Sequence, residues 1–176
     1  MKYKLWKSEG SGTPDKTKLS KCGENVIIED GVRVFHPENI EIGDNVYIGH
    51  DTILKGYFNS KLIIGSNTWI GQQCFIHGAG GVTIGENVGI GPFVKIHAAR
   101  HKELGVDIPI LFSGLEFLEI KICDDCNLGI GSVILPGVEI GKGSKIGANA
   151  VVNKSVQEYS VAVGVPAKVI KKRENK

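Results

Sequence analysis

The residues best suited to acid–base chemistry lie in one short segment, HAARH, at positions 97–101. This segment contains His97, Arg100 and His101, and His77 occurs earlier in a similar context, IHGAG. An imidazole has an unperturbed pKa of about 6.5, so it can accept a proton from a hydroxyl or amine at neutral pH, and it is also a common metal ligand. Which of these two kinds of chemistry is possible depends on how the surrounding strands and loops position the histidines.

A second candidate is the C-x-x-C pair Cys123 and Cys126, a spacing that zinc sites use. No second C-x-x-C accompanies it, and the other two cysteines, Cys22 and Cys74, stand alone. We interpret the four cysteines as small residues of the core and its corners, not as zinc ligands or disulfide partners.

The chain as a whole is organised by a six-residue repeat. From Ile122 to Val152 an aliphatic residue recurs at every sixth position. A helix would scatter such residues around its axis, and a straight strand of this length would span about 100 Å. A chain that bends after each short strand instead returns every sixth residue to the interior, and three such faces make one coil. The repeat therefore predicts a parallel β-helix.

The same spacing can be followed upstream and predicts six coils. The inward positions are Cys22, Ile28, Val34, Ile42, Ile48, Leu54, Ile64, Ile70, Ile76, Ile84, Ile90, Ile96, Ile122, Leu128, Ile134, Ile140, Ile146 and Val152. A glycine directly follows many of them, and we expect these glycines to adopt bend conformations that other residues avoid.

Three short insertions, HPENI, GYFNSK and HGAGG, lengthen corners of the predicted prism. A longer break separates Ile96 from Ile122, and we expect residues 97–120 to leave the prism as a loop. Long loops in compact folds are usually functional or disordered, and this one is too rich in apolar residues for disorder. It should be ordered by packing on its own prism or on a neighbouring subunit.

The chain is expected to form a single domain over residues 1–176. Residues 1–20 carry no repeat and should cap the first coil, residues 21–153 form the β-helix, and residues 154–176 form a C-terminal segment. The basic end of that segment, AKVIKKRENK, is expected to be a short strand, helix or tail.

Net charge is +2, with 21 basic and 19 acidic residues, which gives no argument for nucleic-acid binding. No apolar run is long enough for a membrane span, and MKYKLWKSEG lacks the apolar core of a signal peptide. We therefore expect a cytoplasmic protein with no membrane span.

The repeat places His77 and His97 directly after Ile76 and Ile96, on the same corner of consecutive coils. Neighbouring strands are about 4.8 Å apart, so the two imidazoles should stack. Three interpretations stay open at this point: metal ligands, contacts to a substrate, or structural corner residues.

The sequence resembles the hexapeptide-repeat acyltransferases, particularly the maltose and galactoside O-acetyltransferases and their polysaccharide and nucleotide-sugar relatives. The segments that carry the resemblance are VTIGENVGIGPFVKIHAARH (82–101), the final coils, and GVPAKVI (164–170). It implies a left-handed β-helix, a homotrimer, and acetyl-CoA bound as co-substrate between neighbouring prisms, with no metal. The acceptor it implies is a sugar or nucleotide sugar.

The resemblance also implies site residues. His101 matches the catalytic histidine, which would act as general base on the acceptor hydroxyl or amine. His77, His97 and Arg100 are then expected to contact the acceptor. The residues expected to bind acetyl-CoA are Ile130, Ala148, Asn153, Lys154, Lys168 and Lys171. The sequence departs from the family pattern in two places: Asn127 replaces an aromatic residue, and Gly71 or a neighbouring glutamine replaces an asparagine that helps to position the acceptor. Both departures weaken the assignment of the acceptor more than that of acetyl-CoA.

Two other functions fit the same scaffold. The γ-class carbonic anhydrases share the prism and bind zinc between subunits on three histidines. His77 and His97 resemble two of these, but the third position is Pro92. The other alternative is a trimeric scaffold without catalytic activity, which would bind no CoA.

Overall fold

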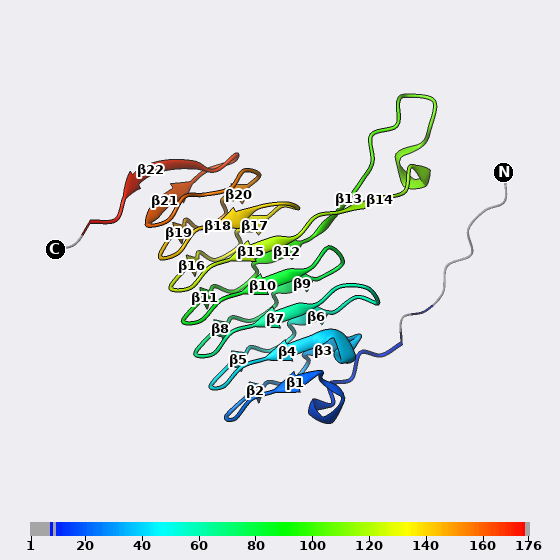
Figure 1. The fold of residues 1–176 in the computed structure, drawn as a ribbon, viewed down its shortest axis with the longest axis vertical. Helices are drawn as coiled ribbons and strands as arrows, with labels where there is room; N and C mark the ends of the chain where they lie inside the picture. Colours follow the sequence, from blue (N-terminus) through cyan, green and yellow to red (C-terminus); the bar gives the residue numbers. More distant parts are fainter. Residues whose placement is uncertain (1–7, 9, 175–176) are drawn as a thin grey trace.

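The computed structural model describes residue 8 and residues 10–174, and it contains a three-sided parallel β-helix (Figure 1). The coils wind in a left-handed sense, opposite to the usual crossover of parallel strands. Each coil contributes one short strand to each of three sheets, which we name A, B and C. The predicted fold class is confirmed.

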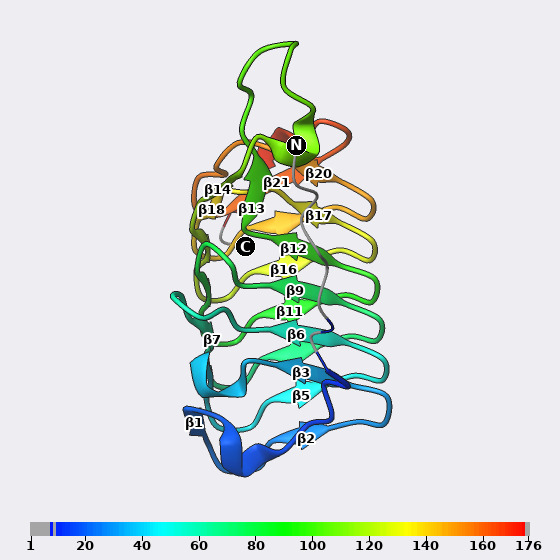
Figure 2. The ribbon, with the colours of Figure 1, turned by 90° about the vertical axis from the view of Figure 1, so that its right-hand side faces the viewer.

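The three sheets run along the prism in regular order. Sheet A comprises β1 (Lys21–Cys22), β4 (Ile40–Ile42), β7 (Leu62–Ile64), β10 (Val82–Ile84), β15 (Ile120–Ile122) and β18 (Glu139–Ile140). Sheet B comprises β2 (Ile27–Ile28), β5 (Tyr47–Ile48), β8 (Trp69–Ile70), β11 (Gly89–Ile90), β16 (Asn127–Leu128), β19 (Lys145–Ile146), β21 (Ser160–Val163) and β22 (Lys168–Lys172). Sheet C, which faces the viewer in Figure 2, comprises β3 (Arg33–Phe35), β6 (Ile53–Lys55), β9 (Phe75–His77), β12 (Lys95–His97), β17 (Val133–Ile134) and β20 (Val151–Val152).

The predicted inward residues form the core. Sixteen of the eighteen positions are buried, and the other two, Cys22 and Ile28 in the first coil, are partly buried against the same core. A second buried position lies two residues before many of them, occupied for example by Val88, Val94, Cys74 and Cys126. Burial raises the pKa of the Cys74 and Cys126 thiols to about 11, as expected for small core residues.

The glycines that follow the inward residues have a different role from the one expected. None of them has a positive φ; a Cβ on Gly65 would instead lie 2.5 Å from the carbonyl carbon of Gly85 in the next coil. A Cβ on Gly129 would similarly lie 2.5 Å from the backbone nitrogen of Ala148. These positions therefore require glycine for the close approach of the next coil, and the expectation of unusual bend conformations was wrong.

The left-handed backbone conformations at the corner between sheets A and B belong mainly to asparagines. Asn25, Asn45, Asn67 and Asn87 have φ between 51° and 57°, a region that asparagine tolerates better than most residues. Their amides form a ladder, with the Asn25 Nδ2 donating to Asn45 Oδ1 at 2.8 Å and Asn45 Nδ2 donating to Asn67 Oδ1 at 3.0 Å. Each coil is thus tied to the next at its corner as well as along its strands.

All the predicted insertions lie at corners. HPENI contains the 3₁₀ helix η2 (Pro37–Asn39), and the turn of GYFNSK is fixed by the Ser60 hydroxyl, which donates to the Gly78 carbonyl at 2.6 Å. Residues 11–20, with η1 (Lys16–Lys18), lie along the first coil, where the Val34 N–H donates to the Gly12 carbonyl. Part of the expected cap, residues 1–7 and 9, lies outside the described residues.

The basic C-terminal segment is a strand. β22 turns back and pairs antiparallel with β21, so the possibility of a basic helix was wrong. All the helices among the described residues are 3₁₀ helices. None of them is long and apolar enough to cross a membrane.

The axial column of aliphatic side chains predicts a clear stability difference between two isoleucines. Ile90 is fully buried in the middle of the prism, so Ile90→Ala should lower the free energy of unfolding by about 2–5 kcal/mol. Ile27, also on sheet B, is 47% exposed, and Ile27→Ala should change it by less than about 1 kcal/mol. Equal losses in chemical denaturation would contradict the assigned core.

Candidate active site

His101 lies on a β-hairpin that projects from the prism. Its strands are β13 (Ala99–His101) and β14 (Leu115–Phe117), which pair antiparallel with His101 opposite Leu115. The connection between them contains the 3₁₀ helix η3 (Ile110–Phe112) and stands clear of the rest of the protein (Figures 1 and 2). The expected loop is therefore ordered as a hairpin.

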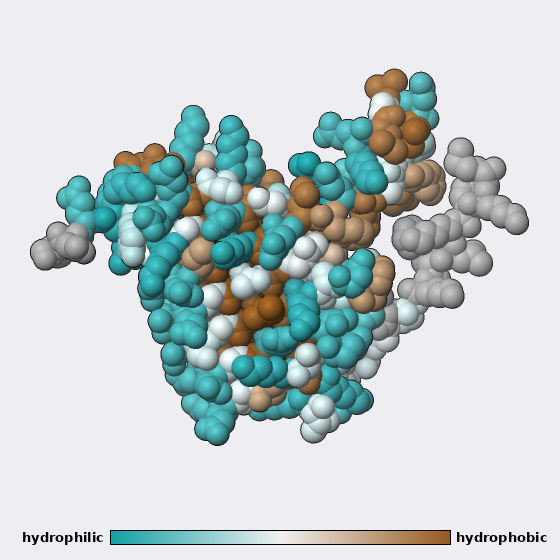
Figure 3. Space-filling view, in the orientation of Figure 1, coloured by the Kyte–Doolittle hydropathy of each residue, from teal (hydrophilic) through white to brown (hydrophobic). Residues whose placement is uncertain are grey.

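The hairpin does not pack on its own prism beyond its base. Its exposed apolar side chains are Leu104, Val106, Ile108, Ile110, Leu111, Phe112, Leu115 and Phe117. Figure 3 shows apolar side chains gathered at the projecting tip. The sequence left two packing partners open for this segment, its own prism and a neighbouring subunit. The tip does not pack on its own prism.

Arg100 and His101 lie on opposite faces of this hairpin, because successive side chains of a strand alternate. The Arg100 Nε donates to Glu116 Oε2 at 2.7 Å, across the strand pair. The structure therefore does not bring Arg100 together with His101 within one protomer.

The base of the hairpin is fixed by aromatic contacts that the sequence did not reveal. The Phe117 ring lies 5.7 Å from the ring of Tyr57, which belongs to the corner GYFNSK. Tyr57 in turn lies 5.7 Å from the His77 ring. The corner insertion and the hairpin are thus joined through one tyrosine, although nothing in the sequence marked Tyr57 as their meeting point.

His77 and His97 stack as predicted. Their ring centroids are 4.6 Å apart with an interplanar angle of 20°, and the strand register places Lys55, His77 and His97 in one column. Phe75 stacks on both histidines, at 5.9 and 6.2 Å. The result is a half-buried row of nearly parallel rings at the foot of the hairpin.

The two histidines of segment 97–101 have different hydrogen-bond environments. The Nδ1 of His97 lies 2.7 Å from the Ala99 carbonyl oxygen. The Nδ1 of His101 is buried and has no hydrogen-bond partner among the residues that the structure describes. One protomer therefore fixes the orientation of the His97 ring but not that of His101.

Two of the residues expected to contact CoA, Ile130 and Ala148, lie in a separate column with Pro92, at the corner between sheets B and C. Pro92, Ile130 and Ala148 follow one another on three successive coils, linked by backbone hydrogen bonds from Gly131 N–H to Pro92 O (2.9 Å) and from Asn149 N–H to Ile130 O (2.8 Å). Ile130 and Ala148 are exposed, so this edge of the prism is accessible.

The lysines expected near CoA phosphates lie on β22. Lys171 lies opposite Val161, and a basic pocket of about 780 Å³ opens there beside Gly147, the residue before Ala148. Three other cations that the sequence did not single out, Lys145, Lys172 and Arg173, line the same pocket together with Glu174. Lys168 lies opposite Val163 on β22 and does not line this pocket.

Asn153 and Lys154 are at the other edge of sheet C. They directly follow β20, whereas His97 ends β12, and the register of β12, β17 and β20 stacks these strand ends. The residues expected at the site are thus split between the two long edges of sheet C. The hairpin, Asn153 and Lys154 occupy one edge, and Ile130 and Ala148 occupy the other.

The strand between the two edges separates them in one protomer. His97 follows Pro92 by five positions, a span of roughly 16 Å at about 3.3 Å per residue. The exposed residues Ile130 and Ala148 therefore lie along the edge of sheet C that is remote from the hairpin of the same chain.

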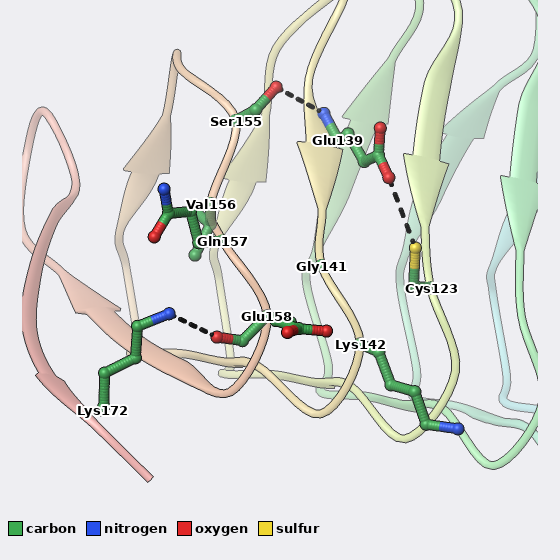
Figure 4. A pocket seen from close by; sticks show the side chains of 9 residues that line it. All are labelled: Cys123, Glu139, Gly141, Lys142, Ser155, Val156, Gln157, Glu158 and Lys172. Carbon is green, nitrogen blue, oxygen red and sulfur yellow. Dashed lines mark hydrogen bonds between the residues drawn. The ribbon is translucent and has the colours of Figure 1, made fainter.

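Another pocket, of about 530 Å³, lies where sheet A ends (Figure 4). Its side chains bond mainly to each other and to the backbone: the Glu139 N–H donates to Ser155 Oγ, and the Lys172 Nζ donates to the Glu158 carbonyl. None of the predicted site residues lines it.

Within residues 8 and 10–174, no group of three or more His, Cys, Asp or Glu side chains could bind a metal ion. Cys126 is buried, with its Sγ 3.2 Å from the Gly141 carbonyl, and Cys123 is half-buried beside Glu139. These contacts confirm that the cysteines are core and corner residues.

Comparison with known proteins connects this geometry to one family. The model described as "Bacterial transferase hexapeptide (six repeats)" matches residues 119–154, and "Hexapeptide repeat of succinyl-transferase" matches residues 61–91. The dTDP-4-amino-4,6-dideoxy-D-glucose acyltransferase of Escherichia coli is 31% identical over 90% of this chain and 84% of its own length. The galactoside O-acetyltransferase of E. coli is 33% identical over 89% of this chain and 65% of its own.

The chain spans 44%, 66% and 50% of the lengths of relatives from Schizosaccharomyces pombe, Saccharomyces cerevisiae and Mycobacterium tuberculosis that carry acetyltransferase names. Among solved structures, AntD, an N-acyltransferase from Bacillus cereus in complex with dTDP and 3-hydroxybutyryl-CoA, superimposes with a TM-score of 0.80 and 28% identity, over 90% of this chain and 86% of AntD. Repeat, fold and sequence agree: the chain belongs to the hexapeptide-repeat acyltransferase family.

Proposed function

We propose that this protein transfers an acetyl group from acetyl-CoA to a hydroxyl or amine of a sugar or nucleotide sugar. The acceptor class rests on the named relatives, which include a galactoside O-acetyltransferase and acyltransferases of dTDP-amino sugars. The chain's own contribution is a basic pocket beside Ala148, suited to the phosphates of CoA, and a histidine-bearing hairpin, suited to proton transfer.

In the proposed reaction His101 accepts the proton of the acceptor as its oxygen or nitrogen attacks the thioester carbonyl. The carbon–sulfur bond then breaks, and CoA leaves as the thiolate, which recovers a proton to give the thiol. Ile130 and Ala148 offer exposed backbone along the edge where the pantetheine arm would lie. Lys171, with Lys145 and Arg173, would neutralise the phosphates.

The split of the site between two edges supports a homotrimer. A hairpin with an exposed apolar tip at one edge of sheet C, and the CoA column at the other, can meet only if a second copy presents its complementary edge. We propose that the hairpin of one subunit reaches the CoA edge of the next, and that repetition around a threefold axis closes the ring. The expected division into cap, β-helix and C-terminal segment, and the cytoplasmic location, stay predictions.

Binding of the donor can be tested without knowing the acceptor. Acetyl-CoA at about 100 times its Kd should stabilise the folded protein by about 2.7 kcal/mol in a thermal-shift titration. Lys171→Ala should weaken binding by roughly three- to tenfold because it removes one phosphate contact. Lys61→Ala, which removes an exposed lysine paired with Glu41 on sheet A, should leave it unchanged. The absence of a saturable shift would reject the transferase.

Once an acceptor is known, His101→Ala should lower kcat by about 10²–10⁴-fold, because the base is lost, while the acetyl-CoA shift persists. Unchanged turnover would remove the assigned role of His101 and leave the donor site in place.

The trimer can be tested at the hairpin tip. Leu111 and Phe112 are 55% and 48% exposed, and the double substitution of both by Asp should dissociate the assembly in light scattering coupled to size-exclusion chromatography. Ile27→Asp, at a similarly exposed isoleucine on sheet B, is the control and should preserve the mass. A wild-type monomer at working concentrations would contradict the intersubunit site.

A further inference from the structure

The His97 ring has a tautomer that the structure determines. A carbonyl oxygen can only accept a hydrogen bond, so the contact of 2.7 Å between Nδ1 and the Ala99 oxygen requires the proton on Nδ1. In the neutral ring Nε2 then carries a lone pair and no proton. His97 therefore presents a hydrogen-bond acceptor at the base of the hairpin.

Stacking restrains this ring further. His77 lies nearly parallel to it at 4.6 Å and Phe75 at 6.2 Å, so tilting the ring out of its plane would break two ring contacts. Turning the ring over by 180° would keep these contacts but break the hydrogen bond to Ala99. Ala99 is itself buried at the first position of β13, two residues before His101. The bond from Nδ1 to Ala99 thus holds the His97 ring, and with it the lone pair of Nε2, against the strand that carries the proposed base.

His101 has no such restraint. Its Nδ1 is buried without a partner among the described residues, so the protomer does not determine which of its nitrogens carries the proton. The two imidazoles of segment 97–101 are consequently not equivalent. Of the two, only His97 has a nitrogen whose role as a hydrogen-bond acceptor is fixed.

We infer that His97, through Nε2, accepts a hydrogen bond from an O–H or N–H group of the acceptor substrate and so contributes to acceptor specificity. The inference rests on the proposed transferase function and defines it more closely. The group bound at His97 must be a donor, such as a sugar hydroxyl or amine, because an acceptor-only group such as a carboxylate or ketone would face the lone pair of Nε2. His77 and Phe75 act as positioning residues that keep the ring in place.

The tautomer can be measured without any acceptor. In long-range ¹H–¹⁵N spectra of protein labelled with ¹⁵N-histidine, the His97 ring should show a protonated Nδ1 and an unprotonated Nε2 at pH values where the ring is neutral. The His97→Asn variant identifies its signals. A ring protonated on Nε2 would overturn the inference, whatever the acceptor.

Two substitutions then separate the two nitrogens. His97→Asn retains an N–H near the position of Nδ1 and can preserve the bond to Ala99, but it removes the Nε2 lone pair. His97→Gln places its amide near Nε2 and gives up the bond to Ala99. His36→Asn is the matched control, since His36 is an exposed corner histidine with φ of 52°, a conformation that asparagine tolerates.

For kinetics, the probes are galactosides and dTDP-4-amino-4,6-dideoxyglucose, with acetyl-CoA as donor. His97→Asn should raise the acceptor KM by roughly three- to tenfold, with kcat and the acetyl-CoA KM within about twofold of wild type. His97→Gln should keep the acceptor KM closer to wild type but melt at a lower temperature. His36→Asn should change neither quantity.

Two kinetic outcomes would overturn the inference while leaving the transferase intact. One is an unchanged acceptor KM in His97→Asn, which would make His97 a structural residue. The other is a hundredfold loss of kcat at constant KM, which would indicate proton transfer in place of binding. Failure of the proposed function is recognised separately, by the absence of acetyl-CoA binding to wild type. If none of these probes is turned over, an NMR spectrum that shows Nε2 protonated would still overturn the inference.

Discussion

The structure depends on how closely successive coils approach at each corner. A Cβ on Gly49 would lie 2.8 Å from the backbone nitrogen of Gln72, and one on Gly65 2.5 Å from the carbonyl carbon of Gly85. Such contacts leave no freedom to slide one coil past the next without separating the ladder hydrogen bonds. The register fixed in this way stacks His77 on His97 and aligns Pro92, Ile130 and Ala148 along one edge.

The close approach of successive coils also limits where residues can be inserted to build a site. Strands and tight corners admit no extra residues, so insertions occur at lengthened corners, and the largest of them becomes the hairpin. Its base is held by the ring contacts of Tyr57 with Phe117 and His77, whereas its tip remains exposed and apolar. A rigid prism that presents a column of exposed residues along one edge and a projecting hairpin at another is suited to assembly with copies of itself.

Much of the fold could be predicted because the repeat reports it directly: every sixth residue faces the axis, and sixteen of the eighteen assigned positions are buried. The histidine stack followed from the same counting. The role of the repeat glycines was mistaken because a sequence does not distinguish a residue that needs positive φ from one that needs space. The basic end was equally ambiguous, since AKVIKK has no strong helix or strand periodicity and its strand depends on the edge that β21 offers.

The site was less predictable, because its chemistry depends on contacts between segments. The fixed tautomer of His97 comes from the path of the chain after β12. The basic pocket at Lys171 forms because β22 returns to pair with β21, which places Lys171 in one row with Val161 and Lys145. Arg100 and His101 lie on opposite faces of the hairpin because residues 99–101 form a strand, and the six-residue repeat does not predict that strand. Resemblance to a family supplied residues, and only the fold indicated which edge each residue occupies.

The central claim, that each site combines the hairpin of one subunit with the CoA edge of another, is tested most directly by complementation. His101→Ala lacks the proposed base, and Ala148→Trp should block the CoA edge, so each homotrimer should be inactive. Unfolding and refolding the two together in equal amounts should restore roughly a quarter of the wild-type sites, since half the hairpins and half the edges are intact and combine at random. Activity that stays absent in verified mixed trimers, while co-refolded wild type recovers, would place the whole site within one chain and contradict the account.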